Sequence, residues 1–320
     1  MRKRAFCAGR WTSCEFAAVS APQQIEPGET GYDHVLSLAV PERSARGRMV
    51  RLGPVLDTIL TAHAYPPAIT HLLAEALVVT ALVGSLVKDG EGQLTMQAKT
   101  EGGIIDLLVC DYRAGELRGY IRHDAQRLAQ LGTNPSLYAL FGKGYLAITF
   151  DLASTGQRYQ GIVPLEGSTL AEACEAYFAQ SEQIPTLIRV AVRSDAAGCV
   201  AGGLLMQHLA EGEEGRERLH VRLDHPEWDH VAALAGSIRH DELVDPDLSL
   251  EALAWRLFHE ENEVRVLPGQ PLARGCRCTL EHYAAVIAQF PEEERKDMRD
   301  DAGLIQIDCA FCSKVFTLDD

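Results

Sequence analysis

The chain has 320 residues, 47 % of them hydrophobic and 23 % charged, which is the composition of a globular protein with one large domain or a few small ones. Its formal net charge of −15 argues against nucleic acid as a partner, because an acidic surface repels phosphates. No uncharged apolar run reaches the roughly 18 residues of a membrane span, and the basic N-terminus is not followed by the apolar stretch of a secretory signal. We therefore expect a cytoplasmic protein with no membrane partner.

The acidic residues are concentrated in one segment of the chain. Residues 211–263 contain 5 basic and 15 acidic residues, a net charge of −10, whereas the preceding 210 residues carry −2 and the last 57 carry −3. Together with the pattern of apolar residues, this predicts four parts. They are a poorly ordered leader at residues 1–31, an α+β core domain at 32–210, an acidic helical linker at 211–263 and a small C-terminal domain at 264–320.

The core domain is predicted to combine short strands with helices. Residues 94–98 alternate apolar and polar side chains, which is the period of a half-buried strand. A long helix after Pro66-Pro67 has apolar residues three and four positions apart, so one face is expected to be buried. Because the strands are short and separated by turns, we expect a mainly antiparallel sheet. Strands are expected at residues 34–40, 48–52, 94–98, 104–110, 116–121, 145–150, 158–163 and 186–193, and helices at 54–63, after 67 and at 169–181.

Three glycine motifs in the core domain are interpreted as turns. They are Gly102-Gly103, Gly142-Lys143-Gly144 and Gly202-Gly203, and none of them fits the G-x(4)-G-K-[ST] phosphate loop. The chain also lacks an H-E-x-x-H motif, a Ser-His-Asp order and paired carboxylates in an apolar setting. No catalytic residue is therefore predicted, and the protein is not expected to be an enzyme.

The acidic linker is predicted to form two helices, at residues 224–239 and 249–259. Helices of this length are marginal in isolation, so they must rest on a neighbouring surface to be stable. Six of the eleven histidines lie in residues 208–259 and are interpreted as solvated surface residues, with a pH sensor or additional metal ligands as the alternatives. These histidines are His208, His220, His225, His230, His240 and His259.

Two cysteine pairs near the C-terminus form the most informative motif of the chain. Cys276-Arg277-Cys278 is followed, after thirty residues, by Cys309-Ala310-Phe311-Cys312. Four soft ligands on two short loops match the tetrahedral demand of Zn²⁺. The sequence therefore predicts one zinc ion held by Cys276, Cys278, Cys309 and Cys312. Four unpaired core cysteines are the alternative interpretation.

The remaining cysteines show no disulfide spacing. Cys110, Cys174 and Cys199 lie in apolar stretches, where buried thiols are expected. Cys7 and Cys14 lie in the leader and are interpreted as incidental tail residues, with a metal or redox pair as the alternative. This cysteine usage agrees with the expected cytoplasmic location.

The C-terminal domain has too few apolar residues for a core of its own. Helices are predicted at residues 279–289 and from Pro291 onward, and a hairpin of residues 305–308 and 315–317 brackets the second cysteine pair. Modules of this size generally need a metal or disulfides to fold. Zinc is therefore expected to supply the folding energy of this domain.

Six short motifs, together with the two cysteine pairs, follow one another along the chain in a specific order. They are Val50-Arg51-Leu52-Gly53-Pro54, Gly142-Lys143-Gly144-Tyr145-Leu146, Tyr177-Phe178, Gln180-Ser181-Glu182-Gln183-Ile184-Pro185-Thr186, Ala201-Gly202-Gly203-Leu204-Leu205 and Arg256-Leu257-Phe258-His259-Glu260-Glu261. In this order they resemble the 33 kDa chaperonin family, the redox-regulated bacterial heat-shock chaperones. The resemblance runs from about residue 32 to the end. Residues 1–31 have no clear counterpart, which suggests a misassigned start codon, and Thr279-Leu280 stands where the family often has Ser-Arg.

The resemblance implies an ATP-independent holdase, a chaperone that is inactive while reduced and zinc-bound. It implies that oxidants form disulfides, expel zinc and unfold the linker, after which homodimers bind unfolding client proteins. Sequence proximity favours the pairs Cys276–Cys278 and Cys309–Cys312, since these are the shortest loops to close. Two other functions stay open: a constitutive zinc-ribbon interaction protein, and a thiol oxidoreductase that uses Cys309 and Cys312.

Overall fold

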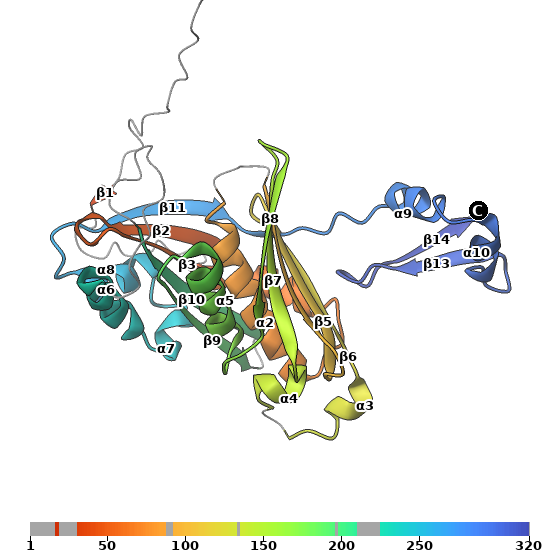
Figure 1. Cartoon of the computed structure of the whole chain (residues 1–320), viewed down its shortest axis with the longest axis horizontal. Helices are drawn as coiled ribbons and strands as arrows, with labels where there is room; N and C mark the ends of the chain where they lie inside the picture. Colours follow the sequence, from red (N-terminus) through yellow and green to blue (C-terminus); the bar gives the residue numbers. More distant parts are fainter. Residues whose placement is uncertain are drawn as a thin grey trace, which may run out of the picture.

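Two six-stranded sheets with a long helix between them form the body of the molecule (Figure 1). The computed structural model describes residues 17–18, 31–87, 92–132, 135–195, 198–209 and 225–319. The predicted leader therefore lies almost wholly outside the described residues, as do Cys7 and Cys14. The predicted α+β class is confirmed, with two sheets in place of one.

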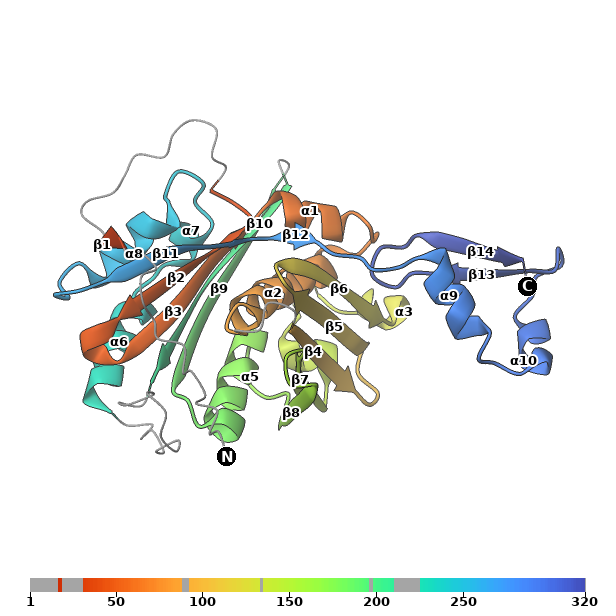
Figure 2. The same ribbon diagram turned by 90° about the horizontal axis from the view of Figure 1, so that it is seen from above.

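The central helix α2, Pro67–Gly84, is apolar on nearly all sides. The predicted face from Ile69 to Val83 is buried, and so is the opposite side, where Val78 and Leu82 lie. Strands of both sheets pack against it, as Figure 2 shows, and a helix covered all round must be apolar all round. By length and composition alone α2 could cross a membrane, but 72 % of it is buried inside the protein, as expected of a core helix.

The first sheet, sheet A, carries apolar side chains on both of its faces. Its strand order is β1-β11-β2-β3-β10-β9, and all neighbours are antiparallel. On β10, Leu205 packs in the cluster around α2, whereas Leu204 and Met206 pack in the cluster on the opposite face. Its strands are β1 (Ala17–Ala18), β2 (His34–Val40), β3 (Ala45–Leu52), β9 (Thr186–Asp195), β10 (Gly198–His208) and β11 (Arg265–Pro271).

The second sheet, sheet B, has the order β12-β6-β5-β4-β7-β8. Its neighbours are antiparallel except for the parallel pair of β12 and β6. The predicted strands of the core domain are thus confirmed in both sheets. The strands of sheet B are β4 (Gln93–Thr100), β5 (Ile105–Arg113), β6 (Glu116–His123), β7 (Gly144–Leu152), β8 (Gln157–Pro164) and β12 (Ala273–Arg274).

Short helices connect the strands of the core domain. Thr169 begins one of them as predicted, because its Oγ1 accepts a hydrogen bond from the N–H of Glu172 at 3.1 Å, while Glu172 Oε2 accepts one from the N–H of Ser168 at 2.6 Å. This helix ends in a π-helical turn, η2 (Phe178–Glu182). The other elements are η1 (Pro41–Arg43), α1 (Pro54–Leu60), α3 (Ala125–Leu128), α4 (Leu137–Phe141) and α5 (Leu170–Tyr177).

The interpretation of Gly202-Gly203 as a turn is wrong, because both glycines lie within strand β10. A Cβ on Gly202 would lie 2.2 Å from the carbonyl oxygen of Leu243 in the linker, and one on Gly203 would lie 2.5 Å from Val78 Cγ1 in α2. Glycine therefore allows β10 to be packed closely from both faces. Gly102-Gly103 does lie in a bend, as predicted.

Three linker helices cover the face of sheet A that is turned away from α2. The helices predicted at 224–239 and 249–259 are confirmed, and a short third helix lies between them, whereas residues 211–224 lie outside the described part of the chain. Their apolar residues, among them Leu243, Leu253 and Leu257, pack in one cluster with the strand residues Leu36 and Met49. The helices are α6 (Pro226–Gly236), α7 (His240–Leu243) and α8 (Leu250–Phe258).

Arg51 of β3 attaches the linker to the centre of sheet A. Its side chain is fully buried, and its guanidinium donates hydrogen bonds to three linker carbonyls. Nε donates to Leu243 at 2.8 Å, Nη1 to Leu248 at 2.8 Å and Nη2 to Glu242 at 3.1 Å. Burial lowers the pKa of Arg51, but a guanidinium stays charged. Sheet A and the linker therefore satisfy each other's buried polar groups here.

The C-terminal module follows two strands that join the body. Strand β11 pairs with β2 and strand β12 pairs with β6, so these two strands belong to sheets A and B. The domain boundary at residue 264 stays a prediction. The module itself projects to one side (Figure 1) and contains the predicted helices and hairpin. Its apolar core is small, with Ile287, Ile305 and Leu318 buried together. Its elements are α9 (Leu280–Ile287), α10 (Glu292–Asp297), β13 (Leu304–Asp308) and β14 (Val315–Asp319).

Replacing Arg51 by methionine should loosen the linker. The Arg51→Met variant leaves three buried carbonyls without donors, so we expect the opening free energy of the linker helices to fall by about 2–4 kcal/mol. Hydrogen exchange should become faster in α7 and α8 and stay unchanged in α2. Arg158→Met on β8 is the control, because the Arg158 side chain is 72 % exposed and surface ion pairs contribute little. Wild-type exchange rates in the Arg51→Met linker would show that apolar packing alone holds it.

Candidate metal centre

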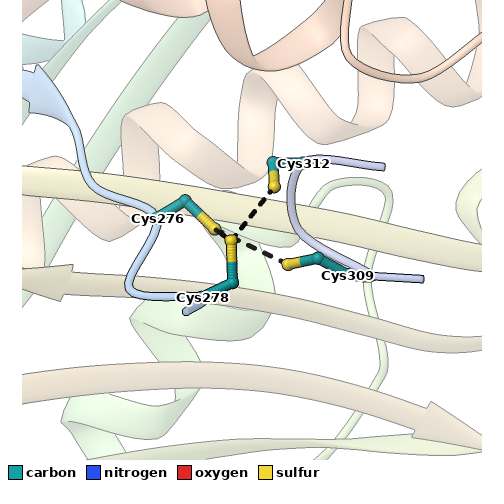
Figure 3. A group of neighbouring side chains, drawn as sticks. All are labelled: Cys276, Cys278, Cys309 and Cys312. Carbon is teal, nitrogen blue, oxygen red and sulfur yellow. Dashed lines mark hydrogen bonds between the residues drawn. The ribbon is translucent and has the colours of Figure 1, made fainter. Parts of the chain in front are cut away.

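Two short loops bring four cysteine sulfurs together (Figure 3). Cys276 and Cys278 lie just after β12, and Cys309 and Cys312 lie in the turn between β13 and β14. In that turn the N–H of Cys312 donates to the carbonyl of Cys309 at 3.2 Å, and Ser313 takes a left-handed conformation with a φ of 54°, which reverses the chain. The four sulfurs all lie within 4.8 Å of one another. The structure thus gathers all four predicted residues into one cluster.

The sulfur positions fit a tetrahedral metal site. Cys276 Sγ is 3.2 Å from Cys278 Sγ and 3.6 Å from Cys309 Sγ, and Cys278 Sγ is 3.4 Å from Cys312 Sγ. Sulfur ligands at about 2.3 Å from a central ion would lie about 3.8 Å from one another. The sulfur separations of 3.2 to 4.8 Å bracket this value, so small side-chain adjustments are enough to place one metal ion among them.

Burial and hydrogen bonding act on these thiols in opposite directions. Burial raises the pKa of Cys276 and of Cys278. At Cys309 burial also acts to raise the pKa, but hydrogen bonds from Tyr283 and from the N–H of Phe311 help to lower it to about 6. These hydrogen bonds favour the thiolate of Cys309, the form that binds metals and reacts with oxidants. The cysteine spacing alone does not predict the contribution of Tyr283.

Residues beside the cysteines attach both loops to sheet B. Arg118 places its Cζ 4.0 Å from the centroid of the Phe311 ring, and the Tyr120 ring meets Phe311 edge-on with centroids 4.9 Å apart. Arg277 Nη1 donates to Gln93 Oε1 at 2.9 Å. The sequence pattern does not predict these contacts. The one local signal for them is the large aromatic side chain of Phe311 between two cysteines of the cluster.

The other cysteines are buried and lie outside the cluster. Cys110, Cys174 and Cys199 are buried, as the sequence predicts. Burial raises the pKa of each of these thiols, which disfavours the reactive thiolate. They are therefore poor competitors of the cluster for metals and oxidants.

The histidines of residues 208–259 differ in their surroundings. Across the described ranges, the four C-terminal cysteines are the only group that could hold a metal ion. The interpretation of His208 as solvated is wrong, because it ends β10 beneath Trp228 of α6 and is only 4 % exposed. His230 is exposed and its Nε2 lies 2.6 Å from Glu261 Oε1. His220 lies outside the described residues.

Metal content should depend on the cluster and be independent of the buried thiols. We expect one metal ion per reduced chain, and a variant that combines Cys309→Ser with Cys312→Ser should lose it, because two of four ligands are missing. Elemental analysis of the purified reduced protein measures this directly. The Cys199→Ala variant is the control and should keep a full equivalent. A full equivalent in the double variant would contradict the assignment of the site.

From residue 33 onward the chain is similar to one family of proteins. The family model of the Hsp33 protein matches residues 33–319. The 33 kDa chaperonin of Caulobacter vibrioides is 39 % identical over 294 residues, covering 90 % of this chain and 95 % of that protein. The 33 kDa chaperonin of Ectopseudomonas mendocina is 39 % identical over 285 residues, covering 87 % and 89 %.

A solved structure shows the same fold. The crystal structure of the 33 kDa chaperonin of Thermotoga maritima, a heat shock protein 33 homolog, matches with a TM-score of 0.72 and 21 % identity. The match covers 90 % of this chain and 95 % of that chain. Because the family model spans most of the sequence and the relatives are similar over nearly their whole length, the chain belongs to the Hsp33 protein family.

Proposed function

We propose that the chain is a redox-regulated, ATP-independent molecular chaperone, a holdase that binds unfolding proteins. It is inactive while Cys276, Cys278, Cys309 and Cys312 hold Zn²⁺, and it becomes active when oxidation forms two disulfides, releases the metal and unfolds the linker. Membership of a family whose relatives are named 33 kDa chaperonins supports a chaperone role. The observation that carries the proposal is the apolar face of sheet A beneath the linker.

This face of sheet A consists of aliphatic and methionine side chains. Leu36, Leu38, Met49, Leu204 and Met206 are each at most 2 % exposed, and they pack against the linker helices. Full burial of a side chain of this size stabilises the folded state by about 1.5–3 kcal/mol. Removing the linker would expose all five side chains to water, and apolar segments of an unfolding client could cover them again.

The linker covers this face of sheet A with three short helices. Its helices have 11, 4 and 9 residues, and helices of this length are marginal without a partner. The net charge of −10 over residues 211–263 opposes compaction further. A few polar contacts hold the linker residues that follow α8, among them the ion pair of Arg43 Nε with Glu261 Oε2 at 2.8 Å. The folded linker therefore depends on its contacts with sheet A and on the strand that follows it.

Zinc is the metal that best matches the ligand set. Soft thiolates select zinc or iron, and a closed set of four thiolates is typical of a structural zinc site. With only Ile287, Ile305 and Leu318 in its core, the C-terminal module would take its folding energy from the metal. When hydrogen peroxide accepts two electrons from two thiolates, one S–S bond forms and the peroxide leaves, with two protons, as two water molecules. Two such events remove all four ligands.

The proposal assigns one task to each part of the chain. Residues 32–210 would bind clients, residues 211–263 would cover the binding face, and residues 264–320 would sense the oxidant. Exposed apolar faces favour association of oxidised chains into homodimers as well as client binding. A cytoplasmic location agrees with this, because a reducing compartment keeps the thiolates available to zinc until an oxidant enters.

Holdase activity should depend on the redox state and be independent of ATP. Light scattering by a heat-unfolded client enzyme should be suppressed by the chain after treatment with peroxide and mild heat, and much less by the reduced zinc-bound chain. Zinc release should accompany activation. Equal suppression by both forms, with zinc retained after peroxide, would favour a constitutive zinc-ribbon interaction protein. Catalytic turnover of a dithiol would favour an oxidoreductase.

Hydrogen exchange supplies the structural control for this experiment. In the oxidised, heated protein, protection should be lost across α6 and α8 and kept in α2, because α2 lies between the two sheets. If holdase activity appears while the linker keeps its protection, the client surface must lie elsewhere than on sheet A.

The oxidised chain should contain the disulfides Cys276–Cys278 and Cys309–Cys312. The sulfur distances do not decide the pairing, because Cys276 to Cys309 at 3.6 Å and Cys278 to Cys312 at 3.4 Å are also close. Loop closure decides it, since unfolding of the module separates the two loops but leaves partners within a loop close together. Peptide mapping under non-reducing conditions would show either these pairs or cross-links between the loops, and the latter would refute the pairing.

A further inference from the structure

The two cysteine loops rest on a polar network that runs across the outer face of sheet B. Gln93 Nε2 donates to Thr95 Oγ1 at 3.1 Å, and Thr95 Oγ1 donates to Asp111 Oδ1 at 2.7 Å. Arg118 Nε donates to the other oxygen, Asp111 Oδ2, at 2.7 Å. Asp111 is only 3 % exposed. Strands β4, β5 and β6 are therefore joined on this face by one continuous hydrogen-bonded row.

Each end of this row contacts one cysteine loop. At the β4 end, Gln93 accepts a hydrogen bond from Arg277, the residue between the first two cysteines. At the β6 end, Arg118 and Tyr120 contact the ring of Phe311, which lies between the second two. Asp111 thus orients the Arg118 guanidinium that contacts the Phe311 ring.

Backbone contacts place the first loop against the same strand. Strand β12 pairs with β6, and the N–H of Gly275 donates to the carbonyl of Leu117 at 2.8 Å. A Cβ on Gly275 would lie 2.3 Å from Glu116 Cβ, so glycine permits this close approach. Cys276 therefore follows directly after a residue that is hydrogen-bonded to sheet B. The second loop has one further contact, a hydrogen bond of 3.2 Å between Ser313 Oγ and His63 Nδ1.

We propose that Arg118 and Tyr120 of β6 are positioning residues for the metal centre, and that docking of the cysteine loops on sheet B raises the affinity of the chain for its metal. The inference rests on the metal binding assumed in the proposed function. Docking requires both loops in the conformation in which four sulfurs converge. Two events that require the same conformation stabilise each other, and this coupling is reciprocal. Residues on sheet B that never touch the metal therefore strengthen its binding and slow its release to oxidants.

Competition with a chromophoric zinc chelator tests the coupling on the reduced full-length chain. Phe311→Ala, Tyr120→Ala and Arg118→Lys should each weaken zinc binding by about three- to tenfold, the size expected for the loss of one aromatic or cation–π contact. Arg118→Lys keeps a charge beside Asp111 but lacks the planar group that stacks on Phe311. Tyr120→Phe keeps the ring and should restore wild-type affinity.

Matched controls separate docking from general effects of truncating an aromatic residue. Phe290→Ala removes an exposed ring from the same C-terminal module, and Tyr159→Ala removes an exposed ring from β8 of the same sheet. Both should bind zinc within about twofold of the wild type. Combining Phe311→Ala with Tyr120→Ala should weaken binding no more than Phe311→Ala alone, because both changes remove the same contact.

The possible results distinguish this inference from the proposed function. Wild-type zinc affinity in Tyr120→Ala and Arg118→Lys would overturn the inference even if the chain is a redox-regulated holdase. A weakened Phe311→Ala variant with additive effects of Tyr120→Ala would also overturn it, because Phe311 would then act only within its own turn. A wild-type chain that binds no zinc would overturn both proposals together.

Discussion

An antiparallel sheet usually has one apolar face and one face in water, but sheet A has aliphatic side chains on both. Leu205 of β10 lies in the cluster around α2, and its neighbours Leu204 and Met206 lie in the cluster under the linker. Such a sheet is stable in water only if both faces are covered. The core helix α2 lies between the two sheets and covers one face. Short acidic helices cover the other face, and the chain joins them to the module that contains the four clustered cysteines.

The C-terminal module differs from sheet A because its buried apolar core is small. Burial of apolar side chains alone is too little to fold it. Its buried cluster contains three residues, and several large side chains on its surface remain exposed, including Leu280, Phe290 and Val315. A tetrathiolate metal site compensates for a small core by fixing two loops at once. Under the proposed function, oxidants would attack the same four thiolates, so oxidation would remove the ligands that stabilise the module.

Local patterns predict most of the helices, the strands and the four clustered cysteines, because caps, alternation and ligand spacing are short-range properties. They do not predict β10 correctly, because two adjacent glycines are typical of a turn. Gly202 and Gly203 lie in a strand that Leu243 and Val78 approach closely from opposite faces. The burial of His208 likewise depends on a distant helix. Contacts such as that of Phe311 with Arg118 join residues far apart in the sequence. What sequence reasoning misses here are tertiary contacts at positions where the local residue type permits several structures.

Under the proposed function, the order of elements between the linker and the cysteine cluster determines how the two would be coupled. Helix α8 ends at Phe258 and the first cysteine is Cys276, and between them β11 joins sheet A and β12 joins sheet B. Strand β12 has only two residues, so little backbone pairing holds it once the cysteine loops leave sheet B. Strand β11 contains Pro268 and Pro271, which cannot donate to the ladder, and its register with β2 shifts between them. Under the proposed function, release of the cysteine loops would free the two-residue strand β12 first, and β11 connects that strand directly to the linker. The strands that pack on α2 would keep their own pairings.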